Sequence, residues 1–331
     1  MILLQSVFTS NNNCPFFSVC IETSNRGRTI YRALASLLNQ DVDNFECIIA
    51  DDCSSDETVA EIERFINSVE YIAKPFPLNL FQNEQKLGGV LNWNSALKYA
   101  KGKYIAGLEG DDYYQKGYLK SALNKLNEDD TIGVYATGSQ RSLRPIKGLI
   151  PSKEYFQYIY QIINIPPPSE TIFIRLDKNG VPFKYNVTEY IYAPEMELLL
   201  SIAADGWNTF HSSSADVYRE PSSSNTNMTW KFFQDKFFLF EKYKKHALIG
   251  KKNYEKAFRR QLLIAIRRYL VCSYQEKGKP ESIRNGIETV LKSEHTFQFN
   301  FYAILFKFLL FLEKYKLFNI YFGLKSKLKS S

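Results

Sequence analysis

The sequence has few of the residues that build the common metal, redox and dinucleotide sites. It has only three histidines in 331 residues, widely separated, so a histidine-rich metal centre is not expected. No Gly-x-Gly-x-x-Gly follows the first expected strand and no Gly-x-x-x-x-Gly-Lys-Ser/Thr occurs, so ordinary dinucleotide and P-loop sites lose support. The five cysteines lack paired metal spacing, and their odd number suits a reduced cytosolic protein.

The chain also lacks a long uncharged apolar stretch. Its most apolar part, residues 297–322, is interrupted by Lys307, Glu313, Lys314 and Lys316, whereas a membrane-spanning helix needs about twenty largely uncharged residues. The first residues have no basic lead and no sustained apolar region, so no signal peptide is expected. We therefore expect a cytoplasmic protein, with the cytoplasmic face of the membrane as the alternative location.

Strand patterns and helical stripes alternate through the first part of the chain. Helical spacing of apolar residues is found from Ile30, from Val59 and from Val90. The expected strands cover residues 16–22, 45–50, 79–82 and 104–108. This alternation predicts an α/β fold with a mostly parallel sheet flanked by helices, and a ligand site at the carboxyl ends of the strands.

Carboxylates gather directly after two of these strands. Glu109, Asp111 and Asp112 follow one strand, and Asp51 and Asp52 end another. Clustered carboxylates repel one another unless they share a cation, and oxygen ligands suit a hard divalent ion such as Mg²⁺ or Mn²⁺. The alternative is an acidic turn that caps the following helix.

In their order and spacing these segments resemble glycosyltransferase family 2, whose members have the nucleotide-sugar-binding GT-A fold. The match runs from about Ser18 to Tyr114 and continues more loosely to about Arg219. The matching segments are Ser18–Arg26, Asp51–Asp56 (similar to the family's DDGSxD element), Asn92–Leu97, Ala100–Ile105 and Glu109–Tyr114 (similar to its DxD element).

The resemblance implies which residues contact the nucleobase. Asp52 would face the base, and the loop with Glu22, Thr23 and Asn25 would lie against it. Glu22 and Ser24 stand where many members carry proline and an aromatic residue, which puts base stacking by this loop in doubt. Cys53 replaces the usual glycine, so either the turn does not require a positive φ or the backbone tolerates some strain.

The resemblance also implies which residues contact the phosphates. Asp111 would approach the ribose, and Asp112 would bind the Mg²⁺ or Mn²⁺ that bridges the diphosphate. Glu109 occupies the first position of the triplet. Arg219 would reach the diphosphate, or is an exposed structural arginine.

A general base is expected in the second half of the chain. Glu195 lies where the resemblance implies the residue that removes the proton of the acceptor hydroxyl, and Glu197 matches a later acid of the same motif. The alternative is ordinary helix-start chemistry, since Pro194 precedes acids in a first turn.

From about residue 229 the sequence becomes rich in Lys, Phe and Tyr in helical runs. We expect a catalytic domain over residues 1–228 and a helical appendage over residues 229–331. The appendage either packs on the catalytic domain or is a basic amphipathic surface for an anionic membrane, to which the net charge of +7 would contribute. Nucleic acid is not expected as a partner, because no recognised binding module appears.

Together the residues and the resemblance predict an inverting, metal-dependent glycosyltransferase. Its donor would be a nucleoside diphosphate-sugar, with a UDP-sugar expected, and its acceptor a hydroxyl of a glycan or a lipid-linked intermediate of a bacterial surface polysaccharide. Inversion follows from the family alone. Two alternatives stay open: a polyprenyl phosphate acceptor, which needs no base, and a nucleotide-sugar-binding homologue without turnover.

Overall fold

The chain forms two compact units in the computed structural model. One contains residues 1–223 with 246–249, and the other contains residues 224–245 with 250–331. The boundary expected between residues 228 and 229 lies outside the described residues, as does most of the apolar region 297–322. The described residues are 1–7, 14–139, 147–162, 168–186 and 194–220, with short segments beyond residue 238 that include helical residues at 254–260 and 262–266.

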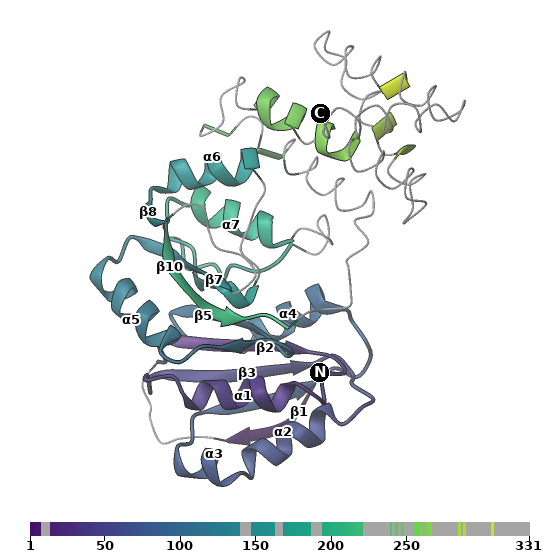
Figure 1. Cartoon of the computed structure of the whole chain (residues 1–331), viewed down its shortest axis with the longest axis vertical. Helices are drawn as coiled ribbons and strands as arrows, with labels where there is room; N and C mark the ends of the chain where they lie inside the picture. The colour runs from purple at the N-terminus through teal and green to yellow at the C-terminus, as the bar shows by residue number, and fades with distance from the viewer. Residues whose placement is uncertain are drawn as a thin grey trace, which may run out of the picture. The chain divides into compact units, whose positions relative to one another are not determined.

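Four parallel strands form the centre of the first unit (Figure 1). Their order is β4-β3-β2-β5, and every residue of β3 is buried. Near-continuous apolar runs are typical of parallel strands that are covered on both faces. The α/β class and the parallel centre are therefore confirmed. The strands are β2 (Phe17–Thr23), β3 (Phe45–Asp51), β4 (Leu78–Gln82) and β5 (Tyr104–Glu109).

Helices connect these strands as the apolar spacing predicts. Helix α1 (Ile30–Leu38) packs against α2 (Thr58–Ile66), and α4 (Gly89–Leu97) packs against β2 and β3. The helical pattern expected from Val59 to Val69 is interrupted, because Ser68 accepts a hydrogen bond from the Tyr71 N–H and begins a separate helix, α3 (Val69–Ala73).

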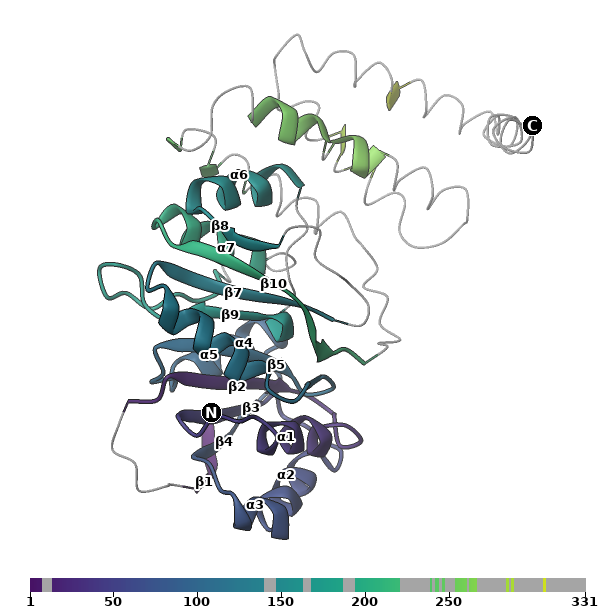
Figure 2. The ribbon, with the colours of Figure 1, turned by 60° about the vertical axis from the view of Figure 1, so that its left-hand side comes forward.

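Antiparallel strands extend the sheet on both sides (Figure 2). Strand β1 (Ile2–Val7), which no sequence pattern predicted, pairs with β4. On the other side β9 (Thr171–Ile174) pairs with both β5 and β7 (Ile132–Ser139). Strand β10 (Asn208–Tyr218) pairs with β7 in parallel from Asn208 onward.

The remaining described elements surround β7 and β10. Strands β6 and β8 are antiparallel to β10, and α6 packs against α7. Within the described parts of the chain, no helix combines the length and the apolar content that crossing a bilayer requires. These elements are β6 (Tyr113–Tyr114), β8 (Gly148–Ile150), α5 (Tyr118–Glu128), α6 (Ser152–Ile162), the 3₁₀ turn η1 (Pro168–Glu170) and α7 (Pro194–Ala204).

Candidate nucleotide and metal site

The carboxyl ends of β2, β3 and β5 bring the predicted acidic residues to one edge of the sheet. Glu22 lies opposite Glu109 in the β2–β5 pairing, and Thr23 lies opposite Asp51 in the β2–β3 pairing. Parallel strands end at the same edge, so residues that are far apart in the sequence meet there. This edge is the place that the sequence analysis assigned to the ligand.

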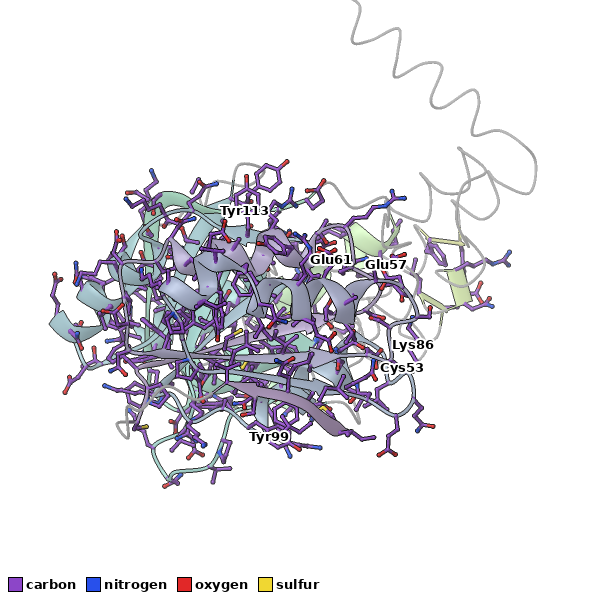
Figure 3. All side chains as sticks on the ribbon, turned by 90° about the horizontal axis from the view of Figure 1, so that it is seen from below. Cys53, Glu57, Glu61, Lys86, Tyr99 and Tyr113 are labelled. Carbon is purple, nitrogen blue, oxygen red and sulfur yellow. The ribbon has the colours of Figure 1, made fainter. Side chains whose placement is uncertain are left out.

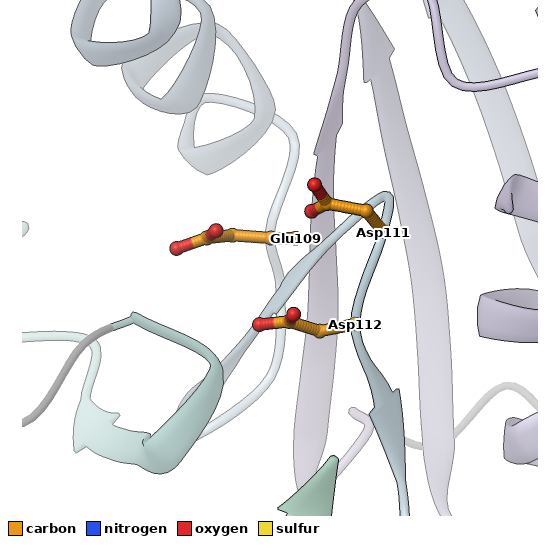
Figure 4. A group of neighbouring side chains, drawn as sticks. All are labelled: Glu109, Asp111 and Asp112. Atoms are coloured by element: carbon orange, nitrogen blue, oxygen red, sulfur yellow. The ribbon is translucent and has the colours of Figure 1, made fainter. Parts of the chain in front are cut away.

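Glu109, Asp111 and Asp112 form a cluster whose carboxylate oxygens lie within 4.8 Å of one another (Figure 4). Asp112 is 2% exposed, and its Oδ1 accepts a hydrogen bond of 3.1 Å from the Glu220 N–H. Its buried Oδ2 has no hydrogen-bond partner and lies 3.6 Å from Nε of Arg219. A buried carboxylate oxygen without a donor, beside two further carboxylates, fits an oxygen-liganded divalent cation.

The electrostatics of this cluster favour an added cation. Burial, together with the charges of Asp112 and Glu22, raises the pKa of Glu109 to about 8 against the opposing effect of Arg219. Burial also raises the pKa of Asp112, although hydrogen bonds from Ser169 and Glu220 and the charge of Arg219 oppose this. A bound divalent ion would remove the cost of ionising these groups side by side.

Asp52 holds the segment that follows β4. Its Oδ1 accepts hydrogen bonds from the Leu87 N–H at 2.7 Å and from Nδ2 of Asn83 at 3.0 Å, and its Oδ2 accepts one from the Gly88 N–H at 2.9 Å. In Figure 3 the labelled Cys53 and Lys86, from the two segments, lie at the same end of the molecule. Asp52 therefore holds the segment from Asn83 to Gly88 in place, and its expected contact with a base stays a prediction.

The loops after β2 and β3 are tied together by side-chain hydrogen bonds. Oδ1 of Asn25 accepts from the Ser55 N–H at 2.9 Å, while Oγ of Ser54 accepts from the Asn25 N–H at 2.8 Å. Asn25 and Cys53 have φ values of 53° and 54°. Of the two interpretations of Cys53, the strained one holds, since the turn does adopt the left-handed conformation that glycine usually provides.

Glu22 is a half-buried acid near the end of β2, beside Ala50 of β3 and Glu109 of β5. Burial raises its pKa most strongly, while the charge of Arg26 and a hydrogen bond with Asn92 lower it. Its carboxylate lies against Gly89, where an added Cβ would approach Oε2 to 3.3 Å. The carboxylate therefore occupies space next to the first turn of α4, where the N–H groups of a helix favour negative charge.

Glu195 lies in the first turn of α7 and is brought near the same edge. Burial raises the pKa of Tyr185 well above its ordinary value, and the charges of Glu195, Glu109 and Glu22 raise it further. The charges of all three glutamates therefore act on the same phenol. Glu197 is instead buried, and its Oε1 accepts a hydrogen bond of 3.0 Å from Oγ of Ser201.

Several residues at the edge were missed by the sequence analysis. Oγ of Ser169 accepts a hydrogen bond of 3.0 Å from the Glu109 N–H. The side-chain amide of Asn94 donates to the backbone carbonyl of Tyr185 and accepts from the Tyr185 N–H. Arg26 forms an ion pair with Asp111. Neither Ser169 nor Tyr185 follows a strand pattern in the sequence. Asn83, which binds Asp52 and was also missed, directly follows β4, and this position could have marked it as a site residue.

Comparison with known proteins gives the same family for this segment. Residues 18–178 match the model of Glycosyl transferase family 2. The chain is 35% identical over 115 residues to the poly(ribitol-phosphate) beta-N-acetylglucosaminyltransferase TarS of Staphylococcus aureus, covering 34% of this chain and 19% of TarS. It is 27% identical over 202 residues to the beta-1,3-glucosyltransferase WfaP of Escherichia coli, covering 61% of this chain and 75% of WfaP.

Solved structures with low sequence identity share the fold. TarS residues 1–349 in complex with UDP-GlcNAc match with a TM-score of 0.64 and 20% identity, over 83% of this chain and 80% of that one. The mannosyltransferase PcManGT from Pyrobaculum calidifontis, in complex with GDP-Man and Mn²⁺, matches with a TM-score of 0.55 and 14% identity, over 93% of this chain and 84% of that one. The fold is therefore GT-A, and residues 18–178, just under half of the chain, form a segment that matches the model of Glycosyl transferase family 2.

Proposed function

We propose that the protein is an inverting, metal-dependent glycosyltransferase that uses a nucleoside diphosphate-sugar, with a UDP-sugar as donor. The observation that supports this best is the cluster of Glu109, Asp111 and Asp112 at the carboxyl end of β5, inside the family 2 segment. TarS was solved with UDP-GlcNAc, and WfaP is named as a UDP-Glc-dependent enzyme, which favours uridine nucleotides.

The residues divide between holding the donor and activating the acceptor. Asp52, with Glu22, Thr23 and Asn25, would form the base pocket, Asp111 would approach the ribose and Asp112 would hold Mg²⁺ or Mn²⁺. The metal supplies Lewis-acid stabilisation of the diphosphate leaving group. Glu195 would accept the proton of the acceptor hydroxyl while that oxygen forms the bond to the anomeric carbon and the nucleoside diphosphate departs.

The acceptor is proposed to be a hydroxyl of a glycan or of a lipid-linked intermediate. WfaP is named as acting on an N-acetylglucosamine diphosphoundecaprenol, a lipid-linked acceptor of this class. Contact of residues 229–331 with a membrane surface remains a prediction.

A donor screen tests the proposal. Purified protein is incubated with UDP-, GDP- and dTDP-sugars, with Mn²⁺, Mg²⁺ or a chelator, and thermal shift is measured alongside release of the nucleoside diphosphate. A stabilisation by UDP-sugars that requires metal supports the proposal, and the anomeric configuration of the product, read by NMR, tests inversion. Donor binding without turnover would leave a nucleotide-sugar-binding protein instead.

A further inference from the structure

The turn that carries the acidic cluster connects β5 to β6 through residues 110–112 (Figure 4). The Asp112 N–H donates to the Glu109 carbonyl at 2.9 Å, and the Gly110 N–H donates to the Glu22 carbonyl at 3.0 Å. Ionised carboxylates within 4.8 Å of one another repel, and this repulsion favours a wider turn in the metal-free protein. Contacts that keep the turn closed without occupying a carboxylate oxygen of the cluster therefore favour metal binding.

Helix α1 and its N-cap supply two such contacts. Oγ1 of Thr29 donates to the Gly110 carbonyl at 2.9 Å, and Nη2 of Arg32 donates to the Asp111 carbonyl at 3.0 Å. Thr29 and Arg32 are three residues apart, a spacing that places two side chains on the same side of a helix. Both bonds go to backbone oxygens of the turn, so neither competes with a metal for a carboxylate oxygen.

The same side of the helix continues along the chain that follows the turn. Oγ of Ser36 accepts a hydrogen bond of 3.2 Å from the Tyr114 N–H, and Nε2 of Gln40 donates to the Gln115 carbonyl at 3.0 Å. Ser36 and Gln40 are buried, whereas 44% of the Arg32 side chain is exposed. The buried pair anchors the segment after the turn, and Thr29 and Arg32 bind the turn itself.

Thr29 departs from the usual behaviour of a helix N-cap. A threonine in this place normally accepts a hydrogen bond from an N–H of the first turn. Within the described α1, no N–H of the first turn donates to this hydroxyl. The hydroxyl lies 2.9 Å from the Gly110 carbonyl and 3.3 Å from the Arg26 carbonyl, so its shorter bond goes to the acidic turn. A local rule that is broken in this way is expected at a functional site.

Arg32 also joins the turn to the segment after β10. Its guanidinium binds Oε2 of Glu220 at 2.6 Å, and the Glu220 N–H donates to Oδ1 of Asp112 at 3.1 Å. A displacement of Arg32 would therefore reach Asp112 by two routes, through the backbone of the turn and through Glu220.

Two stacked tyrosines restrict the guanidinium of Arg32. Its Cζ lies 4.9 Å from the ring centre of Tyr113 and 5.6 Å from that of Tyr218, within the range of a cation–π contact. The two rings stack with their centres 4.6 Å apart, and they belong to residues that pair between β6 and β10. A carbonyl, a carboxylate and two rings therefore fix this half-exposed side chain.

We propose that Thr29 and Arg32 are positioning residues, which keep the turn of residues 110–112 in the geometry that binds the divalent metal. This inference rests on the proposed function, because it needs Asp112 to hold that metal. The two side chains oppose carboxylate repulsion before the metal arrives, so less of the metal's binding energy is used to close the turn.

The sign of the effect separates positioning from simple electrostatics. Arg32 is a positive charge beside a site for a cation, so its removal without any change in the turn would strengthen Mn²⁺ binding. Positioning predicts weaker binding. Thr29 is neutral, and Thr29→Val keeps the shape of the side chain, so weaker binding by this variant would involve no change of charge.

The test measures Mn²⁺ binding in the presence of UDP by electron paramagnetic resonance, together with stability in urea. Arg32→Met should bind Mn²⁺ about tenfold more weakly, as for a lost partner behind a metal ligand. Thr29→Val should lose on the order of fivefold, the size of one neutral hydrogen bond. The matched control is Arg64→Met, because Arg64 pairs with Glu61 and its Cζ lies 3.9 Å from the ring centre of Tyr31. It removes the same kinds of contact from α2, so it should lower stability like Arg32→Met and leave Mn²⁺ affinity unchanged.

The outcomes separate the two levels of the proposal. Unchanged or tighter Mn²⁺ binding by Arg32→Met or by Thr29→Val, in a protein that still binds UDP with metal, overturns the positioning role and leaves the proposed function intact. An equal loss in Arg64→Met also overturns it, because general loosening of the helices would then explain the effect. If Arg32→Met does not fold, Thr29→Val decides alone. Wild-type protein that binds neither Mn²⁺ nor UDP overturns both.

Discussion

The N-terminal half of the first unit, residues 17–114, and its C-terminal half, residues 118–220, position their polar side chains differently. In the N-terminal half the acids lie at the ends of parallel strands, and backbone N–H groups hold them, as Leu87 and Gly88 hold Asp52. In the C-terminal half the strands pair largely antiparallel to their neighbours, and Glu195 is placed by a helix start.

This difference indicates a division of labour between binding and transfer. A ligand held by strand ends and backbone N–H groups meets a rigid surface, which suits recognition of the donor. A residue in the first turn of α7 is positioned by packing against α6, outside the parallel sheet. Substitutions in the two halves should therefore separate donor affinity from the transfer step.

Glu195→Gln should cause the largest loss. Glutamine keeps the shape but cannot accept the acceptor proton, so single-turnover transfer at saturating donor should fall on the order of 10²- to 10⁴-fold. Donor affinity, titrated in parallel, should change little. Glu197→Gln tests the competing acid and should transfer nearly normally, since Glu197 is buried and its Oε1 accepts a hydrogen bond from Ser201. Near-normal transfer by the Glu195 variant would point to Glu197 or to a polyprenyl phosphate acceptor that arrives already ionised.

Asp112→Asn should remove metal-dependent donor binding. A single metal carboxylate is expected to contribute several kcal/mol, so the affinity for UDP with Mn²⁺ should fall on the order of 10²- to 10³-fold while the protein stays folded. Asp43→Asn removes an exposed acid that precedes β3, at the opposite end of that strand from Asp51, and should leave binding unchanged. Unaltered binding of metal and UDP by the Asp112 variant would show that the metal site lies elsewhere.

Asp52→Ala should weaken donor binding through the segment that it holds. Its loss removes the acceptor of the Leu87 and Gly88 N–H groups, which water can partly replace, and one acceptor of the buried Asn83 amide, which costs about 1–3 kcal/mol. We expect lower stability in urea and a donor KM raised by more than turnover falls, because such contacts act alike in ground and transition states. A pure turnover defect would instead place Asp52 among the catalytic residues.

The halves also differ in how far the sequence predicts them. In the N-terminal half, apolar runs followed by acids locate β2, β3 and β5 and the acidic edge, because buried parallel strands have continuous apolar patterns. In the C-terminal half β8 and β9 are only three and four residues long, and such short runs carry no periodicity. Tyr185 and Ser169 reach the edge through tertiary contacts, which local pattern does not encode.

A pH titration of stability tests Glu109, a half-buried acid of the N-terminal half. Burial, with the charges of Asp112 and Glu22, raises the pKa of Glu109 from 4.5 to about 8 in the folded protein. Folding therefore favours the protonated carboxyl group. Its contribution to the free energy of unfolding is fully present below the unfolded pKa and is lost as the pH rises through the folded pKa. Between about pH 5 and pH 8 the metal-free protein should lose on the order of 1–3 kcal/mol. Glu109→Gln should flatten this slope, and an unchanged slope would refute the assignment.

The smallest effect is expected at the strained turn between the two acid-bearing loops. Cys53 has a φ of 54°, and a residue with a Cβ pays about 1–2 kcal/mol for this conformation. Cys53→Gly removes that strain but increases the flexibility of the unfolded chain, so a net gain of about 0.5–1 kcal/mol in the free energy of unfolding is expected. Cys53→Ala keeps the Cβ and should show no gain, which separates backbone strain from loss of the thiol. If Cys53→Gly does not raise the free energy of unfolding, then hydrogen bonds such as that from the Asn25 N–H to Oγ of Ser54 already offset the strain of the turn. The loops of the N-terminal half would then be held even more rigidly for a ligand.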